Sequence, residues 1–338
     1  MNLSKVRIAV VGATGVVGRE ILSILQSRDV PAGRIAALAS PRSVGASIPY
    51  GSGALTVRGA DSAELAGVDL ALFAASSAVA RELAPQAAAS GALVVDNSSA
   101  FRLSPGVPLI VPEINPHALR ETQTRIISNP NCSTIIMLTA IEPLRRCGGV
   151  RSIHVSTYQS VSGAGQAGID ALTHEIANGS KGHESPFAEP CFLNVFSHNS
   201  TVETESGVNG EERKMIEETR KILGADTLAI TPTCVRVPVF RAHSQAIVVR
   251  LDRAISEFDA RRAYENAEGV RLVDDRAGNR FPTPLKAAGG NDVLVGRLRP
   301  DPAIELVGGR SDSWCLFACG DQLRKGAALN AVQIAELA

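Results

Sequence analysis

Several features that mark other classes of protein are missing from this chain of 338 residues. Lys plus Arg and Asp plus Glu both number 34, so the formal net charge is zero. A neutral chain gives no electrostatic reason to expect a nucleic acid or a membrane as a partner, and we predict neither. The sequence has no internal repeat, no low-complexity segment, no signal peptide and no apolar run of the ~20 residues that a membrane-spanning helix needs. We therefore expect a cytoplasmic protein.

Paired cysteines are also missing. The sequence has six cysteines but no C-x-x-C motif, and no histidine pair completes a zinc-binding pattern. We expect free thiols in a reducing compartment and no bound metal. The cysteines are Cys132, Cys147, Cys191, Cys234, Cys315 and Cys319.

The length of the chain suggests about two domains, and the sequence pattern changes near Val150. Before that point, apolar strand-like runs alternate with helix-like segments, which is typical of an α/β domain with a parallel sheet. After it the pattern is richer in strands and predicts an α+β domain. Within this second half we expect a helix over Glu211 to Leu223, a strand over Thr233 to Arg241, and a closing helix over Leu323 to Ala338.

A glycine motif follows the first strand-like run, Val6 to Val11. Gly12, Gly15 and Gly18 have the spacing G-x-x-G-x-x-G and precede a helix-like segment. This order of strand, glycine turn and helix is the context of a dinucleotide-binding site, with the pyrophosphate at the helix N-terminus. A glycine-rich turn without a ligand is the alternative.

The end of the second strand, Arg34 to Ala39, indicates which dinucleotide binds. NAD enzymes usually carry Asp or Glu near this point, to hold the ribose 2′-hydroxyl. Here Arg42 and Ser43 follow instead. A cation and a hydroxyl suit a 2′-phosphate, so we predict NADP. The alternative is an ordinary exposed arginine in a loop.

Polar loops follow two further strands of the first half. Val68 to Ala74 leads into a loop that contains Ser76, and Leu93 to Val95 leads into the segment from Asp96 to Arg102. Ligands of open α/β sheets lie beyond the carboxyl ends of the strands, where both loops are expected. We predict that Arg102 binds an anionic group of the substrate. A surface ion pair is the alternative.

The segment Ser128-Asn129-Pro130-Asn131-Cys132 precedes an apolar run that ends near Leu144. Asn129 or Asn131 is a suitable helix cap, so we place Cys132 at a helix N-terminus. There the helix dipole and the free N–H groups favour a thiolate and would stabilise an oxyanion on a carbon bonded to the sulfur. Cys132 is therefore a candidate covalent nucleophile. The alternative is a small buried apolar residue.

One histidine of the second half is a candidate acid/base group. Arg236 and His243 bracket a strand-like segment, and histidine titrates near neutral pH. A hydrogen-bonded structural imidazole is the alternative.

Together, these motifs resemble those of the aspartate-semialdehyde dehydrogenase family, in the same order along nearly the whole chain. The segment Ser-Asn-Pro-Asn-Cys-Ser-Thr at 128–134 is similar to its active-cysteine motif. Similar segments lie at 12–18, 96–102, 158–165, 236–244 and 323–336.

The resemblance implies a role for each matching residue. Cys132 matches the nucleophile, His243 the acid/base residue, and Gln159 a group that orients the substrate. Substrate binding is implied for Arg102, Asn131, Glu211, Lys214 and Arg236, with Glu212 as an alternative to Glu211. Cofactor binding is implied for Gly12, Thr14, Gly15, Val16, Val17, Arg42, Ser43, Ser76, Ser162, Gly163 and Gln322.

The resemblance also implies an organisation and a reaction. We expect a Rossmann-type NADP-binding domain over residues 1–130, completed by a C-terminal helix at about 320–338. We expect a catalytic and dimerisation domain with a mixed sheet and flanking helices over 131–319, and a homodimer or homotetramer. The implied reaction is the NADPH-dependent reductive dephosphorylation of L-4-aspartyl phosphate to L-aspartate 4-semialdehyde through an acyl-enzyme. It would serve the biosynthesis of lysine and diaminopimelate, threonine, methionine and isoleucine.

Two other readings remain open. The first is a reductase of N-acetyl-γ-glutamyl phosphate, whose cysteine motif resembles Asn-Pro-Gly-Cys. The second is a non-catalytic, cofactor-binding paralogue. Loss of Cys132 or His243 would indicate such a paralogue, and both residues are present.

Overall fold

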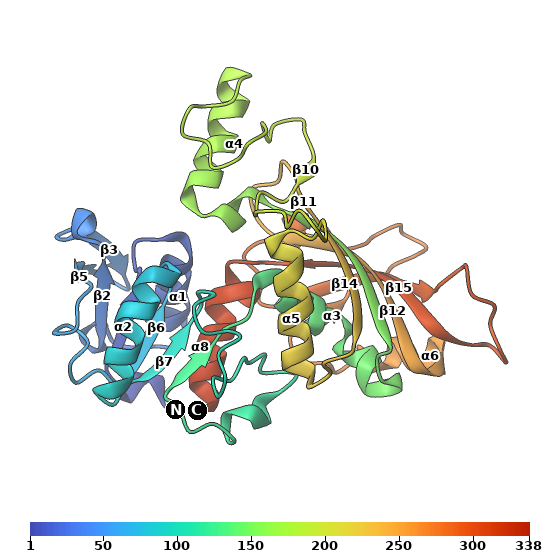
Figure 1. Cartoon of the computed structure of the whole chain (residues 1–338), viewed down its shortest axis with the longest axis horizontal. Coiled ribbons are helices and arrows are strands. Elements are labelled where there is room, and N and C mark those ends of the chain that lie inside the picture. The colour runs from blue at the N-terminus through green and yellow to red at the C-terminus, as the bar shows by residue number, and fades with distance from the viewer. The chain divides into compact units, whose positions relative to one another are not determined.

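The structure, a computed structural model, describes residues 1–338. Its chain divides into two compact units, one made of Met1–Asn131 with Gly326–Ala338 and the other of Cys132–Lys325. Each unit is built around a sheet of its own (Figure 1). None of the helices combines the length and the apolar character that a membrane crossing requires.

The first unit contains a six-stranded parallel sheet. The first strand lies inside the sheet, with the second strand on one side and the sixth on the other, so the chain order reverses at this point. A reversal of this kind leaves a crevice at the carboxyl ends of the strands. In sheet order the strands are β5 (Arg58–Gly59), β2 (Ile35–Ala39), β1 (Ile8–Val11), β6 (Leu70–Phe73), β7 (Leu93–Asp96) and β8 (Ile126–Ser128).

Helices cover both faces of this sheet, which explains why its strands are apolar throughout. Helices α1 (Val16–Ser27) and α8 (Leu329–Leu337) share one apolar cluster, whereas α2 (Ser77–Ala89) contributes to a second cluster with other side chains of the same strands. The chain termini meet on this unit, where the Met1 amine donates to the Glu336 carbonyl (2.7 Å; Figure 1).

Two local features, one at the start of the C-terminal helix and one in the first unit, differ from the sequence pattern. The closing helix predicted from Leu323 begins with a π-helix, Arg324–Ala328. Apolar spacing does not distinguish the two helix types over one turn, so the sequence pattern does not predict this feature. The other feature is an additional hairpin of β3 (Ser47–Tyr50) and β4 (Gly53–Thr56).

The second unit contains a seven-stranded mixed sheet. In β9 (Ser152–Gln159), buried and exposed residues alternate, so one face of that strand is covered and the other is open. In sheet order the strands are β10 (Phe196–Ser197), β11 (Ala229–Arg236), β9 (Ser152–Gln159), β12 (His243–Ser256), β15 (Arg310–Gly320), β14 (Val293–Pro300) and β13 (Val270–Leu272).

The helices of the second unit pack mainly against its sheet. Helix α3 (Cys132–Gly148) contacts β12, β14 and β15, and lies beside α5 (Gly210–Leu223) and α6 (Glu257–Ala263) (Figure 1). The strand predicted over Thr233 to Arg241 ends at Arg236, shortly before Pro238, which has no N–H to donate to a neighbouring strand. The helices are α3 (Cys132–Gly148), α4 (Gln166–Asn178), α5 (Gly210–Leu223), α6 (Glu257–Ala263) and α7 (Pro284–Ala287).

Candidate functional site

The glycine turn of the first unit lies at the point where the strand order reverses. Gly12 has φ +89°, and a Cβ at this position would lie 2.3 Å from the carbonyl oxygen of Ala74. Only glycine fits a turn this close to the neighbouring chain. Gly15 then caps α1 with no side-chain hydrogen bond, so no cap side chain satisfies the first N–H groups of the helix. These groups are suited to a pyrophosphate.

The other predicted cofactor residues of this unit lie at the ends of neighbouring strands. Thr14, in the glycine turn, donates to the hydroxyl of Ser43 (3.4 Å), in the short helix after β2. Arg42 in the same helix is exposed and makes no ion pair. Ser76 caps α2. Val16 and Val17 open α1. The structure therefore brings hydroxyls, a helix N-terminus and an unpaired cation to one edge of the sheet, which fits a phosphorylated dinucleotide.

Arg102 of the same unit is buried and held by backbone carbonyls. Its Nε donates to Asn129 (2.9 Å) and its Nη2 to Asn97 (2.7 Å). Asn129 is fixed in turn by Asn97 and Asn330. These contacts lie next to Asn131, at the end of the segment that leads to Cys132.

In the second unit, Cys132 is the first residue of α3 and is half-buried. The following residue, Ser133, links this helix start to the sheet. Its hydroxyl accepts a hydrogen bond from Gln159 Nε2 (2.8 Å) and its carbonyl one from Gln245 Nε2 (2.9 Å). The N-terminus of α3 is thus held by the last residue of β9 and by a residue near the start of β12.

Ser160, directly after β9, forms hydrogen bonds with both Arg236 and His243. Its carbonyl accepts from Arg236 Nη1 (2.7 Å), and its N–H donates to His243 Nδ1 (3.1 Å). Because Nδ1 accepts this N–H, a neutral imidazole carries its proton on Nε2. His243 is fully buried, and its Nε2 has no hydrogen-bond partner in the protein. Burial, with the Arg236 cation, lowers the pKa of His243 to about 3.

Three predicted cofactor residues of this unit, Ser162, Gly163 and Gln322, lie near Arg236 and His243. A Cβ at Gly163 would lie 3.1 Å from both Arg236 Nη1 and His243 Cε1, so a larger residue would crowd both side chains. The amide of Gln322 bridges the Ser162 hydroxyl and the N–H of Ala242, a non-glycine residue with φ +72°.

The start of α5 distinguishes Glu211 from Glu212. Glu212 completes the capping box with Asn209, and its other oxygen accepts the N–H of Cys234 (3.0 Å). Glu211 accepts from Gln159 Nε2 (3.0 Å) and from Lys214 Nζ (3.2 Å). Only Glu211 therefore shares contacts with other predicted site residues.

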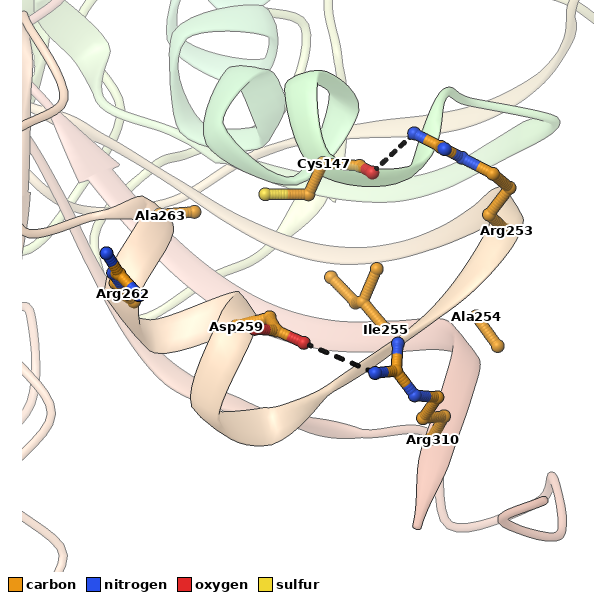
Figure 2. Close-up of a pocket in the computed structure, with 8 residues that line it drawn as sticks. All are labelled: Cys147, Arg253, Ala254, Ile255, Asp259, Arg262, Ala263 and Arg310. Carbon is orange, nitrogen blue, oxygen red and sulfur yellow. Dashed lines mark hydrogen bonds and ion pairs between the residues drawn. The ribbon is translucent and has the colours of Figure 1, made fainter. Parts of the chain in front are cut away.

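A separate pocket of about 590 Å³ lies at the other end of α3 (Figure 2). No predicted site residue lines it. It is lined by Cys147, Arg253, Ala254, Ile255, Asp259, Arg262, Ala263 and Arg310.

Sequence reasoning missed Ser160, His198 and Asn199, which all contact Arg236. Ser160 lies inside the segment 158–165, whose resemblance to the family is a signal that could have identified it. His198 and Asn199 lie in an irregular stretch without periodicity. Only the pairing of β10 with β11, in which Phe196 faces Arg236, brings them to the site.

Comparisons with known proteins cover nearly the whole chain. The model of the semialdehyde dehydrogenase NAD binding domain matches residues 7–122, and that of the semialdehyde dehydrogenase dimerisation domain matches residues 141–325. The aspartate-semialdehyde dehydrogenase of Synechocystis sp. is 46% identical over 338 residues, which cover 99% of this chain and 97% of that protein. That of Aquifex aeolicus is 40% identical over 98% of this chain and 97% of its own length.

Solved structures agree with these sequence matches. The crystal structure of Vibrio cholerae aspartate semialdehyde dehydrogenase II complexed with ASA has a TM-score of 0.90 and 38% identity, and it covers 98% of this chain and 97% of its own. The likeness thus includes both units and the segments that carry the contacts described above. The chain belongs to the aspartate-semialdehyde dehydrogenase family.

Proposed function

We propose that Cys132 of this aspartate-semialdehyde dehydrogenase is the nucleophile, and that the reaction passes through an acyl-enzyme on its sulfur. The enzyme converts L-4-aspartyl phosphate to L-aspartate 4-semialdehyde, in the biosynthesis of lysine and diaminopimelate, threonine, methionine and isoleucine. The observation that carries the residue assignments is the junction at Ser160, which holds Arg236 and the neutral His243 together.

The first half-reaction is an attack by the Cys132 thiolate on the acyl carbon of aspartyl phosphate. The C–S bond forms, the C–O bond to phosphate breaks, and phosphate leaves as the anion. The position of Cys132 as the first residue of α3 supports this step, because helix N–H groups stabilise both the thiolate and the oxyanion of the tetrahedral intermediate. A thiolate also leaves readily when the adduct later collapses to the aldehyde.

His243 would act as a hydrogen-bond donor to this oxyanion. Ser160 holds the ring with its proton on Nε2, and a ring with a pKa of about 3 stays neutral at physiological pH. The Nε2–H group then stabilises negative charge on the substrate oxygen without giving up its proton. We therefore propose that His243 acts as a neutral hydrogen-bond donor rather than as a titrating acid/base residue.

Arg236 would bind the carboxylate of the substrate, because a planar guanidinium suits a carboxylate better than an ammonium does. Glu211, held by Gln159 and Lys214, would face the substrate amino group, while Gln159 orients the substrate next to Ser133. Arg102, Asn131 and Lys214 are our candidates for the phosphate contacts. We propose Glu211 rather than Glu212 for the contact to the amino group, because the Glu212 carboxylate is used in capping α5.

The first unit would bind NADP at Gly12, Thr14, Gly15, Val16, Val17, Arg42, Ser43 and Ser76, and the second unit would contribute Ser162, Gly163 and Gln322. When bound, the reduced nicotinamide supplies the hydride that reduces the acyl group. The unpaired Arg42 beside Ser43, with no acidic residue at the end of β2, supports NADP over NAD. We expect Arg42→Ala to raise the KM for NADP by about tenfold while leaving that for NAD within about twofold. Equal changes in both would refute the assignment.

We further propose a cytoplasmic homodimer. The exposed side chains of β9 are His154, Ser156 and Tyr158, and a groove of about 350 Å³ runs beside them along β11 and β12. The match of residues 141–325 to a dimerisation domain supports a second copy on this open face. Tyr158→Arg would then give monomers in size-exclusion chromatography with light scattering.

The test of the function is NADP reduction by L-aspartate semialdehyde, with and without phosphate. Turnover that requires phosphate is the expected result, because phosphate must release the acyl group from Cys132. Activity with N-acetylglutamate semialdehyde instead would keep the mechanism and change the substrate. No turnover with either would indicate a non-catalytic protein.

A further inference from the structure

Arg236 is a buried cation that is held only by neutral acceptors. Its terminal nitrogens donate to the Ser160 carbonyl (2.7 Å), His198 Nε2 (2.9 Å) and Asn199 Oδ1 (2.8 Å). No carboxylate pairs with it, and its Nε is buried without a partner. The ring of Phe187 lies 5.3 Å from the guanidinium carbon. Buried arginines are usually paired with a carboxylate, so this arrangement is unusual.

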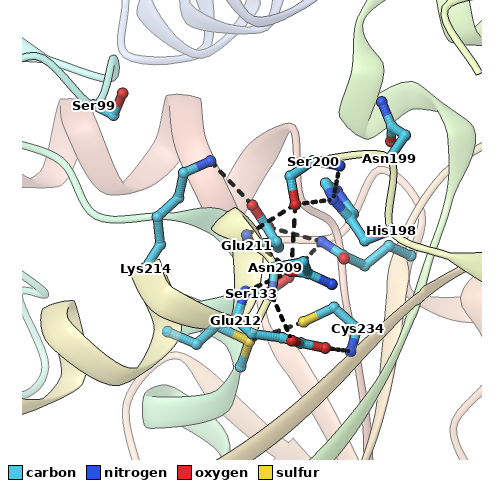
Figure 3. Close-up of polar contacts among 12 residues, drawn as sticks. Ser99, Ser133, His198, Asn199, Ser200, Asn209, Glu211, Glu212, Lys214 and Cys234 are labelled. Atoms are coloured by element: carbon cyan, nitrogen blue, oxygen red, sulfur yellow. Dashed lines mark hydrogen bonds and ion pairs between the residues drawn. The ribbon is translucent and has the colours of Figure 1, made fainter. Parts of the chain in front are cut away.

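The His198 ring is fixed between Arg236 and the start of α5. Its Nε2 accepts from Arg236, because a guanidinium nitrogen can only donate, and its Nδ1 lies 3.2 Å from both the backbone nitrogen and the hydroxyl of Ser200. That hydroxyl accepts the N–H of Glu211 (3.0 Å), and the backbone N–H of His198 is bonded to Cys234 in β11. Figure 3 shows this chain of contacts from the loop to the N-terminus of α5. The ring is thus held in place as an acceptor.

We infer that His198 and Asn199 are positioning residues that aim Arg236 at the substrate carboxylate while leaving it without an ion-pair partner in the protein. The inference rests on the proposed function of Arg236. Neutral acceptors fix the orientation of the guanidinium without an ion pair. Glu211 and the Cys132 thiol act on Arg236 electrostatically but form no hydrogen bond with it, so the substrate carboxylate can form a direct ion pair there. A carboxylate at either position would form that ion pair within the protein and compete with the substrate. His198 and Asn199 therefore favour a substrate that carries a carboxylate.

The sharpest test is Asn199→Asp, which keeps the shape of the side chain and adds one negative charge next to Arg236. The KM for aspartate semialdehyde should rise by about tenfold or more, with kcat within about threefold of wild type. Asn194→Asp is the matched control, because it makes the same change in the same segment. The side chain of Asn194 bonds only to the backbone of Pro190 and Val195, so its KM should be unchanged.

Two changes at His198 separate positioning from a structural role. His198→Gln keeps a neutral oxygen acceptor and should retain a KM within about threefold of wild type, whereas His198→Ala should raise it by about tenfold. A merely structural role would lower Tm and kcat in both variants alike. If wild type turns over aspartate semialdehyde while Asn199→Asp and His198→Ala keep its KM, the inference is wrong and the function stands. Wild type without turnover would overturn both.

Discussion

The two ends of helix α3 carry the same residue type in opposite surroundings. Cys132 opens the helix, where Gln159 and Gln245 bind the adjacent Ser133. Cys147 lies in the last turn, where Arg253 donates to its carbonyl (3.0 Å). The helix dipole favours an anion at the first position and disfavours it at the second.

Side-chain charges increase this difference. Burial raises the pKa of the Cys147 thiol, the Asp259 carboxylate raises it further, and Arg253 only partly offsets them. At the Cys132 end, Arg236 and His243 lie together, and the thiol interacts electrostatically with Arg236. Position along one helix, together with nearby charges, therefore favours a thiolate at Cys132 and disfavours one at Cys147.

The largest expected effect is the loss of activity in Cys132→Ala. Removing a covalent nucleophile should lower kcat by on the order of 10⁴-fold or more, measured as NADP reduction by aspartate semialdehyde. Cys147→Ala is the matched control at the other end of α3, and its kcat should stay within about twofold of wild type. Circular dichroism and Tm establish that both variants are folded. Substantial activity in Cys132→Ala would contradict the assignment of Cys132 as the nucleophile.

His243→Asn should have the next largest effect, a loss of about 10²- to 10³-fold in kcat, because an oxyanion donor is removed or displaced. The pH profile distinguishes a neutral donor from a titrating base. With a folded-state pKa of about 3, His243 is neutral throughout the physiological range, so kcat should show no inflection from this residue near its ordinary value of 6.5. An inflection near pH 6.5 that disappears in His243→Asn would restore the acid/base assignment.

The same pKa predicts how stability depends on pH. The folded-state value lies below the unfolded value of 6.5, so the unfolded chain binds more protons between about pH 6.5 and 3. The contribution of His243 to stability is therefore present above pH 6.5 and lost as the pH falls toward 3. Urea unfolding of wild type should lose stability more steeply over this range than that of His243→Asn. Equal slopes would contradict the burial of a neutral ring.

The extent to which the sequence predicts these features depends on how local their causes are. The glycine turn at Gly12 and the start of α3 at Cys132 follow from residues within one turn of chain, and both agree with the sequence pattern. The partners of Arg236 do not follow from neighbouring residues of the chain. His198 reaches Arg236 through β10, a two-residue strand that is too short to show alternation. The tautomer of His243 likewise depends on Ser160, 83 residues away.

Thiol labelling measures the difference between Cys132 and Cys147 directly, and the expected effect is smaller than the losses of activity above. At pH 7, iodoacetamide should modify Cys132 at least about tenfold faster than Cys147, because the thiolate is the reacting form. Peptide mapping by mass spectrometry resolves the two sites, and aspartate semialdehyde should protect Cys132 alone. Faster modification of Cys147 would mean that the charges around the pocket in Figure 2 outweigh burial and the helix dipole.

The smallest expected effect concerns the charge that faces Cys147. Asp259 lies in α6 and raises the pKa of this thiol, so Asp259→Asn should lower it and speed the alkylation of Cys147 by about two- to fivefold. Arg253→Gln removes the opposing cation and should slow the same reaction. Neither change should alter the labelling of Cys132, whose surroundings are set at the other end of α3. If both variants label Cys147 at the wild-type rate, the flanking charges do not govern this thiol, and the contrast between the helix ends rests on the helix dipole.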